Sequence, residues 1–268
     1  MITNSSFPTQ IPVQEVIGLP VTALTFNQQI SLIVKWGRSR LSKVVCVANV
    51  HMLVEACEDA HLASVLNNAD LVTPDGMPLV WMLRLLLGKF QDRVAGQDIL
   101  VGVCQEAQQE NLPVFFVGSD SETLWRMRDR LQREFPNLRI AGMEPLPFGN
   151  LPLPQAEELA VIDQIHASEA GIVFVSLGCP KQEKWMASKQ DQIQAVMVGV
   201  GGVFPVYAGI HRRAPKLIRE LGLEWLYRLV QEPKRLWGRY RKTIPPFLWR
   251  ASKQLWEFRS QGSMATKS

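Results

Sequence analysis

The chain has 268 residues, of which 47% are hydrophobic and 20% are charged, which fits a folded globular protein with a large core. No run of about 18 uninterrupted apolar residues occurs, so we expect no transmembrane helix, and residues 1–14 lack the basic and apolar regions of a signal peptide. The net charge of +4 is uneven: residues 211–259 carry nine more basic than acidic residues, whereas residues 1–210 carry six more acidic than basic ones. Such a basic tail predicts an anionic partner, for which phosphate groups are the usual source.

The four cysteines show neither metal-ligand spacing nor paired spacing. Most of them lie in apolar segments, which favours buried free thiols and a reducing compartment.

Apolar runs rich in β-branched residues alternate with helical patterns along the first 210 residues. In chain order, strands are expected over 14–22, 43–50, 69–73, 113–117, 138–143, 171–177 and 194–200, and helices over 25–40, 52–67, 77–87, 99–110, 122–135, 155–168 and 184–190, with a Pro- and Gly-rich loop over 143–154. This alternation predicts a Rossmann-like α/β fold with a mostly parallel sheet and helices on both faces.

Polar or flexible residues stand where several of these strands end. Because the carboxyl ends of parallel strands share one edge of a sheet, we expect them to converge on one cleft. They are Asn49, Asp75, Gly118, Gln182 and Gly202.

Asp75 follows Thr73 and Pro74 and precedes Gly76 at a strand-to-helix corner. Two interpretations stay open from the local sequence. The local sequence favours the first, in which Asp75 is a turn residue that caps the following helix. The second is a carboxylate presented to a ligand at the edge of the sheet.

The other corners allow similar pairs of interpretations. Asn49 either bonds its own backbone in a turn or presents its amide to a ligand. Asp98 is expected to cap the helix over 99–110, and Gly96 allows a close approach of the backbone. The turn over 118–121 has the pattern of a phosphate cradle, although any strand-to-helix corner in such a fold resembles one.

Residues 1–210 are therefore expected to form the α/β body, and residues 211–268 a basic helical appendage that holds four of the eight tryptophans. Pro245 and Pro246 are expected to break its helix, leaving an amphipathic piece over 247–258. An anionic membrane surface and simple packing on the body both explain this composition; no nucleic-acid module is recognisable. We expect Trp225 and Tyr227 to pack on the body and the piece over 249–258 to meet the membrane.

Taken together, the motifs make the sequence resemble the WecG/TagA/CpsF glycosyltransferases, over nearly the whole chain after the first twenty residues or so. Any one of these motifs alone would be weak, but together and in this order they are specific. They are Asn49, the stretch 69–76, Arg93 to Gly96, the stretch 178–183, the stretch 199–204, Arg213 to Pro215, the stretch 222–228, and Glu232 with Pro233.

The resemblance implies an inverting transfer of a sugar from a nucleotide-sugar to a polyprenyl-diphosphate-linked saccharide, in the assembly of a cell-surface polysaccharide or teichoic-acid-type polymer. The best-known donor of the family is UDP-N-acetylmannosamine, and the acceptor is lipid-linked N-acetylglucosamine. The resemblance also implies no metal and no cofactor, a Rossmann-like body, and an appendage that reaches the inner face of the cytoplasmic membrane. The oligomeric state stays open, and a homo-oligomer is compatible with the sequence.

The resemblance also assigns roles to residues of this chain. Asp75 matches the general base, and Arg228 and Arg235, with Gly201 and Gly202, match the contacts to the nucleotide diphosphate. The remaining matches concern the sugar or the acceptor, and they are Asn49, Gln182, Lys181, Arg93 and Gly96.

Three positions depart from the family pattern. Val47 replaces a common Thr, Pro205 replaces a common Asp, and Gly238 replaces an arginine for which Arg239 or Arg241 could substitute. The donor therefore stays open among N-acetylmannosamine, glucose, mannose and a uronic acid, and a non-catalytic nucleotide-sugar-binding protein remains the alternative. A dehydrogenase is disfavoured, because no Gly-x-Gly-x-x-Gly corner with a downstream acidic partner occurs.

Overall fold

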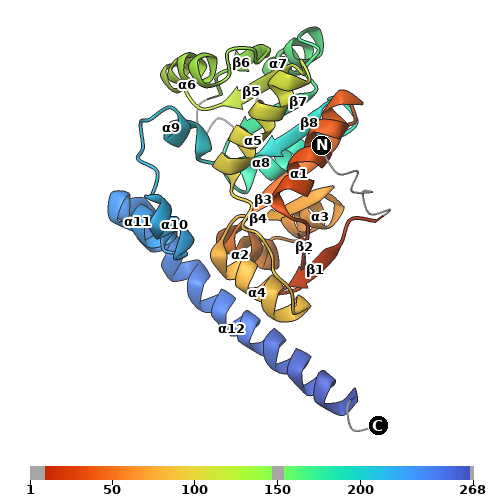
Figure 1. Ribbon diagram of the computed structural model, residues 1–268, viewed down its shortest axis with the longest axis vertical. Coiled ribbons are helices and arrows are strands. Elements are labelled where there is room, and N and C mark those ends of the chain that lie inside the picture. The colour runs from red at the N-terminus through yellow and green to blue at the C-terminus, as the bar shows by residue number, and fades with distance from the viewer. Residues whose placement is uncertain (1–9, 147–153, 266–268) are drawn as a thin grey trace.

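The computed structural model describes residues 10–146 and 154–265. Its centre is a sheet of six strands in the order β4-β3-β8-β7-β5-β6, in which every neighbouring pair is parallel (Figure 1). The expected α/β fold with a mostly parallel sheet is thereby confirmed. The strands are β3 (Lys43–Ala48), β4 (Leu71–Pro74), β5 (Val114–Gly118), β6 (Ile140–Glu144), β7 (Ile172–Ser176) and β8 (Val196–Gly199).

The sheet is covered on both faces because its central strands are apolar on both sides. In β3, Val44 and Cys46 enter one core, whereas Val45 and Val47 enter the other, as the two-residue period of a strand requires. One face is covered by α1 (Phe26–Arg38), α5 (Gly96–Gln109), α6 (Ser121–Glu134) and α9 (Val203–Tyr207), and the other by α2 (Val50–Glu58), α3 (Ala60–Asn68), α4 (Met77–Leu87), α7 (Gln155–Ala167) and α8 (Lys181–Lys189).

Two expected elements are each divided in the structure. The strand expected over 14–22 is an antiparallel hairpin of β1 (Val13–Val16) and β2 (Leu19–Thr22), because Ile17 and Gly18 take positive φ angles and form a tight turn. The helix expected over 52–67 is interrupted at Asp59, whose side chain accepts the Leu62 N–H and starts α3. The loop expected over 143–154 lies mostly outside the described residues.

The segment after residue 211 forms α10 (Lys216–Glu220), α11 (Glu224–Gln231) and the long α12 (Pro233–Ala265). The expected break at Pro245 and Pro246 is wrong, since α12 continues through both prolines. The helix runs along α2 and α4 (Figure 1), and Phe247 and Ala251 are buried in the core of the body. This packing offsets the backbone hydrogen bonds that the prolines cannot make.

Within the described residues, every helix is too short or too polar to cross a membrane.

Candidate active site

Two cavities open at the carboxyl edge of the sheet, where β3, β4, β7 and β8 end and α11 and α12 cover them. We call them the polar cavity, about 180 Å³, which reaches Gly201 and Gly202, and the apolar cavity, about 350 Å³, which reaches Trp81 and Ile244. They form one continuous cleft, because six residues line both: Asn49, His51, Asp75, Glu224, Arg228 and Arg239. The cleft lies where an open α/β sheet is expected to bind its ligand.

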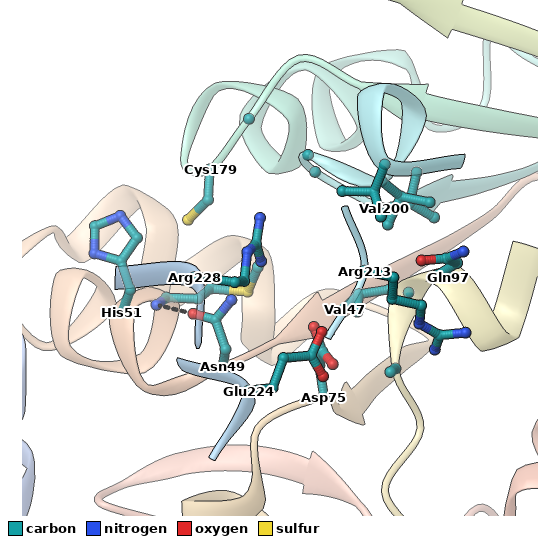
Figure 2. Close-up of a pocket in the computed structure, with 18 of the residues that line it drawn as sticks. Val47, Asn49, His51, Asp75, Gln97, Cys179, Val200, Arg213, Glu224 and Arg228 are labelled. Atoms are coloured by element: carbon teal, nitrogen blue, oxygen red, sulfur yellow. Dashed lines mark hydrogen bonds between the residues drawn. The ribbon is translucent and has the colours of Figure 1, made fainter. Parts of the chain in front are cut away.

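Asp75 stands at the junction of the two cavities. Its backbone N–H donates to the Ala48 carbonyl at 2.9 Å, which fixes it directly after β4. The expectation that it caps the following helix is wrong: Gly76 takes the N-cap position of α4, no side chain caps that end, and Pro78, in the first turn, has no N–H to offer. The carboxylate faces the cleft instead (Figure 2).

The surroundings of Asp75 raise its pKa to about 6. Burial is the largest cause, the charges of Arg93 and Arg228 oppose it, and the carboxylates of Glu224 and Asp98 add to it. A carboxylate with a pKa near 6 is ionised at neutral pH and accepts a proton more readily than an ordinary Asp, as a general base must.

An ion-pair network joins the body to the appendage beside this carboxylate. Arg93 Nη1 donates to Glu224 Oε2 at 2.5 Å, and Figure 2 shows the carboxyl groups of Glu224 and Asp75 directed toward the same end of the polar cavity. Asp98 pairs with Arg213 at 2.5 Å and approaches Arg93 at 3.8 Å and Arg219 at 4.0 Å. Arg93, expected to bind substrate, therefore lies in the cleft and also holds α11 over it.

The polar cavity is rich in arginines from the segment after residue 211. Arg228, on α11, reaches toward the Gly201–Gly202 turn, and its Nη2 lies 3.5 Å from the place that a Cβ on Gly202 would take. Several guanidinium groups around one cavity are suited to a diphosphate, which they bind by charge-assisted hydrogen bonds. The arginines that line it are Arg212, Arg213, Arg228, Arg235 and Arg239.

Gln182 shapes the opposite wall. Its Oε1 accepts the Gly201 N–H at 3.0 Å, and its Nε2 donates to Glu183 Oε1 at 2.6 Å. Ser176 Oγ also donates to the Gly201 carbonyl at 2.6 Å, so the left-handed turn at Gly201 (φ +61°) is held from both sides. Burial raises the pKa of Glu183 to about 7. The structure therefore places Gln182 in the cavity wall as a brace for the turn.

Asn49 has the backbone-capping role that the sequence predicts, and its predicted contact with a ligand stays a prediction. Its Oδ1 accepts the Met52 N–H at 3.2 Å and caps α2, while the residue lines both cavities. Gly96 begins α5, and a Cβ there would lie 3.1 Å from Val203 Cγ2 and 3.3 Å from the Val200 carbonyl oxygen. Gly96 thus lets α5 pack closely against the wall of the cavity. Asp98 is not the cap of α5, since that helix starts three residues before Ile99.

The structure does not bring every expected residue to the cleft. Lys181 begins α8 but lines neither cavity. Gly118 also lines neither, so the prediction that it joins the cleft is wrong. Its corner is not a free phosphate cradle, because the Asp120 carboxylate already accepts the Thr123 N–H there at 2.8 Å. Of the two substitutes for the arginine missing at position 238, Arg239 lines both cavities.

Several lining residues escaped the sequence analysis as site residues, and four of them carry polar or reactive groups close to Asp75, Asn49 or Gln182. Glu224, Arg213 and Cys179 stand within the family motifs, and this position was the available signal. His51 lies outside them, two residues after Asn49, and only the fold turns it into the cleft (Figure 2). Burial, with a smaller contribution from Arg239, lowers the pKa of His51 to about 4, so the imidazole is neutral at physiological pH. No group of three or more His, Cys, Asp or Glu side chains within residues 10–146 and 154–265 is arranged to hold a metal ion.

Comparisons with known proteins agree on one family. A family model described as "Glycosyl transferase WecG/TagA/CpsF family" matches residues 14–261. A protein of Bacillus spizizenii (strain ATCC 23059 / NRRL B-14472 / W23), named N-acetylglucosaminyldiphosphoundecaprenol N-acetyl-beta-D-mannosaminyltransferase, is 35% identical over 205 residues, which cover 76% of each chain. A protein of the same name from Bacillus subtilis (strain 168) is 31% identical over 201 residues, or 75% of each chain.

Proposed function

The chain belongs to the WecG/TagA/CpsF family of glycosyltransferases, and from this premise we propose that it transfers N-acetylmannosamine from UDP-N-acetylmannosamine to polyprenyl-diphosphate-linked N-acetylglucosamine. The transfer inverts the anomeric carbon and serves the assembly of a cell-surface polymer. One observation carries the proposal: a carboxylate with a raised pKa, Asp75, stands in a cleft that arginines of the appendage close from the other side.

In this reaction Asp75 is the general base. It takes the proton of the acceptor hydroxyl while the hydroxyl oxygen bonds to the anomeric carbon and the bond to the nucleotide diphosphate breaks. Burial and the charge of Glu224 raise the pKa of this carboxylate while Arg93 keeps it ionised at neutral pH, which is the state that a base at neutral pH needs. Asn49 is positioned to direct its amide to a sugar hydroxyl.

The leaving group is the nucleoside diphosphate, and positive charge must offset the charge that develops on it. Arg228 is the main donor in this proposal, because it spans the polar cavity toward Gly202. Arg235 lines the same cavity while Glu232 holds its Nε at 2.5 Å, and Arg239 provides a third guanidinium. The backbone of the Gly201–Gly202 turn would lie close to the phosphates, and the hydrogen bond to Gln182 stabilises this turn.

The test is release of free nucleoside diphosphate from a panel of UDP-sugars in the presence of a short-chain polyprenyl-diphosphate-N-acetylglucosamine. Acceptor-dependent release from UDP-N-acetylmannosamine alone supports the proposal. Release from a glucose, mannose or uronic-acid donor instead would assign a different sugar. These donors are included because Val47 lines the polar cavity with methyl groups where the family commonly has a Thr. UDP binding without any release would favour a non-catalytic nucleotide-sugar-binding protein.

We also propose that the enzyme works at the inner face of the cytoplasmic membrane, held there by the appendage after residue 210. The support is the basic charge of this segment and the outward tryptophans of α12, of which Trp249 and Trp256 are 65% and 72% exposed. Such a helix is suited to an anionic surface, where tryptophan enters the headgroup boundary and cations stay at the phosphates.

A further inference from the structure

We propose that the apolar cavity is the binding groove for the hydrocarbon chain of the lipid-linked acceptor, so that the enzyme holds the first isoprene units of its substrate in addition to the diphosphate and the sugar. The inference rests on the proposed function and deepens it. It assigns a role to the apolar end of the cleft, which the transfer chemistry does not use.

The chemistry of the walls changes along the cleft. At the junction, Arg228 and Arg239 line both cavities next to Asp75, so an acceptor diphosphate can lie on their apolar-cavity side while the nucleotide diphosphate lies on their polar-cavity side. Beyond them the walls become apolar, formed by Met77 and Trp81 of α4 on one side and by Trp225, Leu236 and Ile244 of α11 and α12 on the other. A diphosphate joined to a hydrocarbon chain has this same order of polar and apolar parts.

The groove continues past the apolar cavity. A third cavity, about 220 Å³ and lined by Leu229 and Trp237 among others, shares Trp225, Tyr240 and Ile244 with it. Trp225 and Tyr240 pack edge to face at 5.9 Å between ring centroids and thus form a shared aromatic wall. The second half of the path from Asp75 to this end is lined mainly by apolar side chains, with Arg241 as the charged residue of the third cavity, and it ends at Trp237, which is 64% exposed.

Close packing defines the floor where the appendage meets α4. A Cβ on Gly222, whose φ is +73°, would lie 3.0 Å from Met77 Cγ and 3.2 Å from a ring carbon of Trp81. The turn before α11 therefore approaches α4 as closely as a glycine allows. Trp81 remains 47% exposed, and Leu85, one helical turn further on α4, is 54% exposed, so the apolar cavity also opens at its side, beside an apolar surface of α4. A lipid chain leaving the groove there would meet an apolar surface before it meets water.

The experiment uses two soluble acceptors, methyl-diphosphate-N-acetylglucosamine and farnesyl-diphosphate-N-acetylglucosamine, and measures the ratio of their kcat/KM values. Wild type should favour the farnesyl acceptor by at least about tenfold, since burial of even two methylene groups accounts for that factor. Ile244→Asn and Trp81→Ser should lower this ratio about tenfold. The matched controls Leu248→Asn and Trp125→Ser, whose side chains are exposed and line neither cavity, should keep it.

A second measurement separates this inference from the proposed function. Calorimetric binding of farnesyl diphosphate requires no transfer, and it should weaken about tenfold in Ile244→Asn and Trp81→Ser while both controls bind like wild type. If no sugar is transferred to either acceptor but this binding difference appears, the proposed function fails and the groove stands. If transfer occurs and all five proteins share the same chain-length ratio and the same affinity, the groove is overturned. Thermal unfolding of each variant identifies any loss of fold.

Discussion

Burial, with smaller effects from neighbours of both charges, sets the pKa of the Asp75 carboxylate and so the pH range in which it can act as a base. Its pKa of about 6 lies above the ordinary value of 3.8, so the ionised form is disfavoured in the folded protein. The group therefore stabilises the fold at low pH, and this contribution is lost as the pH rises through about 6. At neutral pH, Asp75 costs stability and provides reactivity, as functional groups often do.

The substitution Asp75→Asn separates these two effects. We expect turnover to fall by at least about 100-fold, because the amide cannot accept the acceptor proton. The melting temperature at pH 7 should rise by a few degrees, because the disfavoured charge is removed. Steady-state kinetics and thermal unfolding measure the two. Asp163→Asn, on the exposed side of α7, is the matched control and should change neither. Near-normal turnover of Asp75→Asn would remove Asp75 from the role of base.

Glu224 adds to the effect of burial on the pKa of that base. In wild type we expect kcat/KM to decrease as the pH falls below about 6, the pKa of Asp75. Arg93, Arg228, Asp98 and Glu224 are the charged groups that act on Asp75. Glu224→Gln removes a charge that raises this pKa and frees Arg93 to face Asp75, so the acid limb should move to lower pH.

The pH–rate profile of kcat/KM checks this expectation, with Glu220→Gln, an exposed residue of α10 that pairs with Lys216, as the control. A lower rate with an unchanged midpoint would mean that Glu224 only holds α11 in place. A midpoint that moves upward would contradict the electrostatic account.

At the scale of elements, the sequence predicts what depends on local pattern and misses what depends on distant packing. The runs at β3, β5 and β7 are continuous and apolar, so their strands are predicted nearly to the residue. The course of α12 through Pro245 and Pro246 is not predictable from local sequence, because the burial of Phe247 and Ala251 against the body stabilises it. The hairpin at Ile17 and Gly18 was missed because a positive φ at a β-branched residue is rare.

The two faces of α12 allow a clean test of the membrane proposal. Truncation before Pro245 would also remove Phe247 and Ala251 from the core, so loss of vesicle binding would not be specific. Trp249 and Trp256 are exposed and two turns apart on the same side of the helix. Trp249→Ser with Trp256→Ser should weaken binding to anionic vesicles several-fold at unchanged melting temperature, and added salt should weaken what remains. Sedimentation with vesicles measures this, and Trp125→Ser on α6 is the control; equal binding by the double variant would refute the role of α12.

At the scale of the whole molecule, the cleft exists only because the appendage folds back over the sheet. The family motifs pointed to Asp75, Asn49 and Arg228 one by one, and the fold brings all three to the same cleft. The contacts that close it were not predictable, because Arg93 and Glu224 are 131 residues apart and Asp98 and Arg213 are 115 apart. Pairing at such separations follows from the packed fold and leaves no periodic signal in the sequence.

Asp98 is the central residue of this closure, since it faces Arg213, Arg219 and Arg93 from the body. Its side chain is 33% exposed, so solvent screening reduces the loss in Asp98→Asn to roughly 1 kcal/mol. That corresponds to hydrogen exchange in α10 and α11 that is about fivefold faster, with lower turnover because Arg228 and Glu224 leave the cleft more often. Asp129→Asn, which breaks an exposed pair with Arg133 on α6, should leave both unchanged. High salt should mimic Asp98→Asn in wild type and add little to the variant, whereas equal exchange rates in the two proteins would show that apolar packing alone closes the cleft.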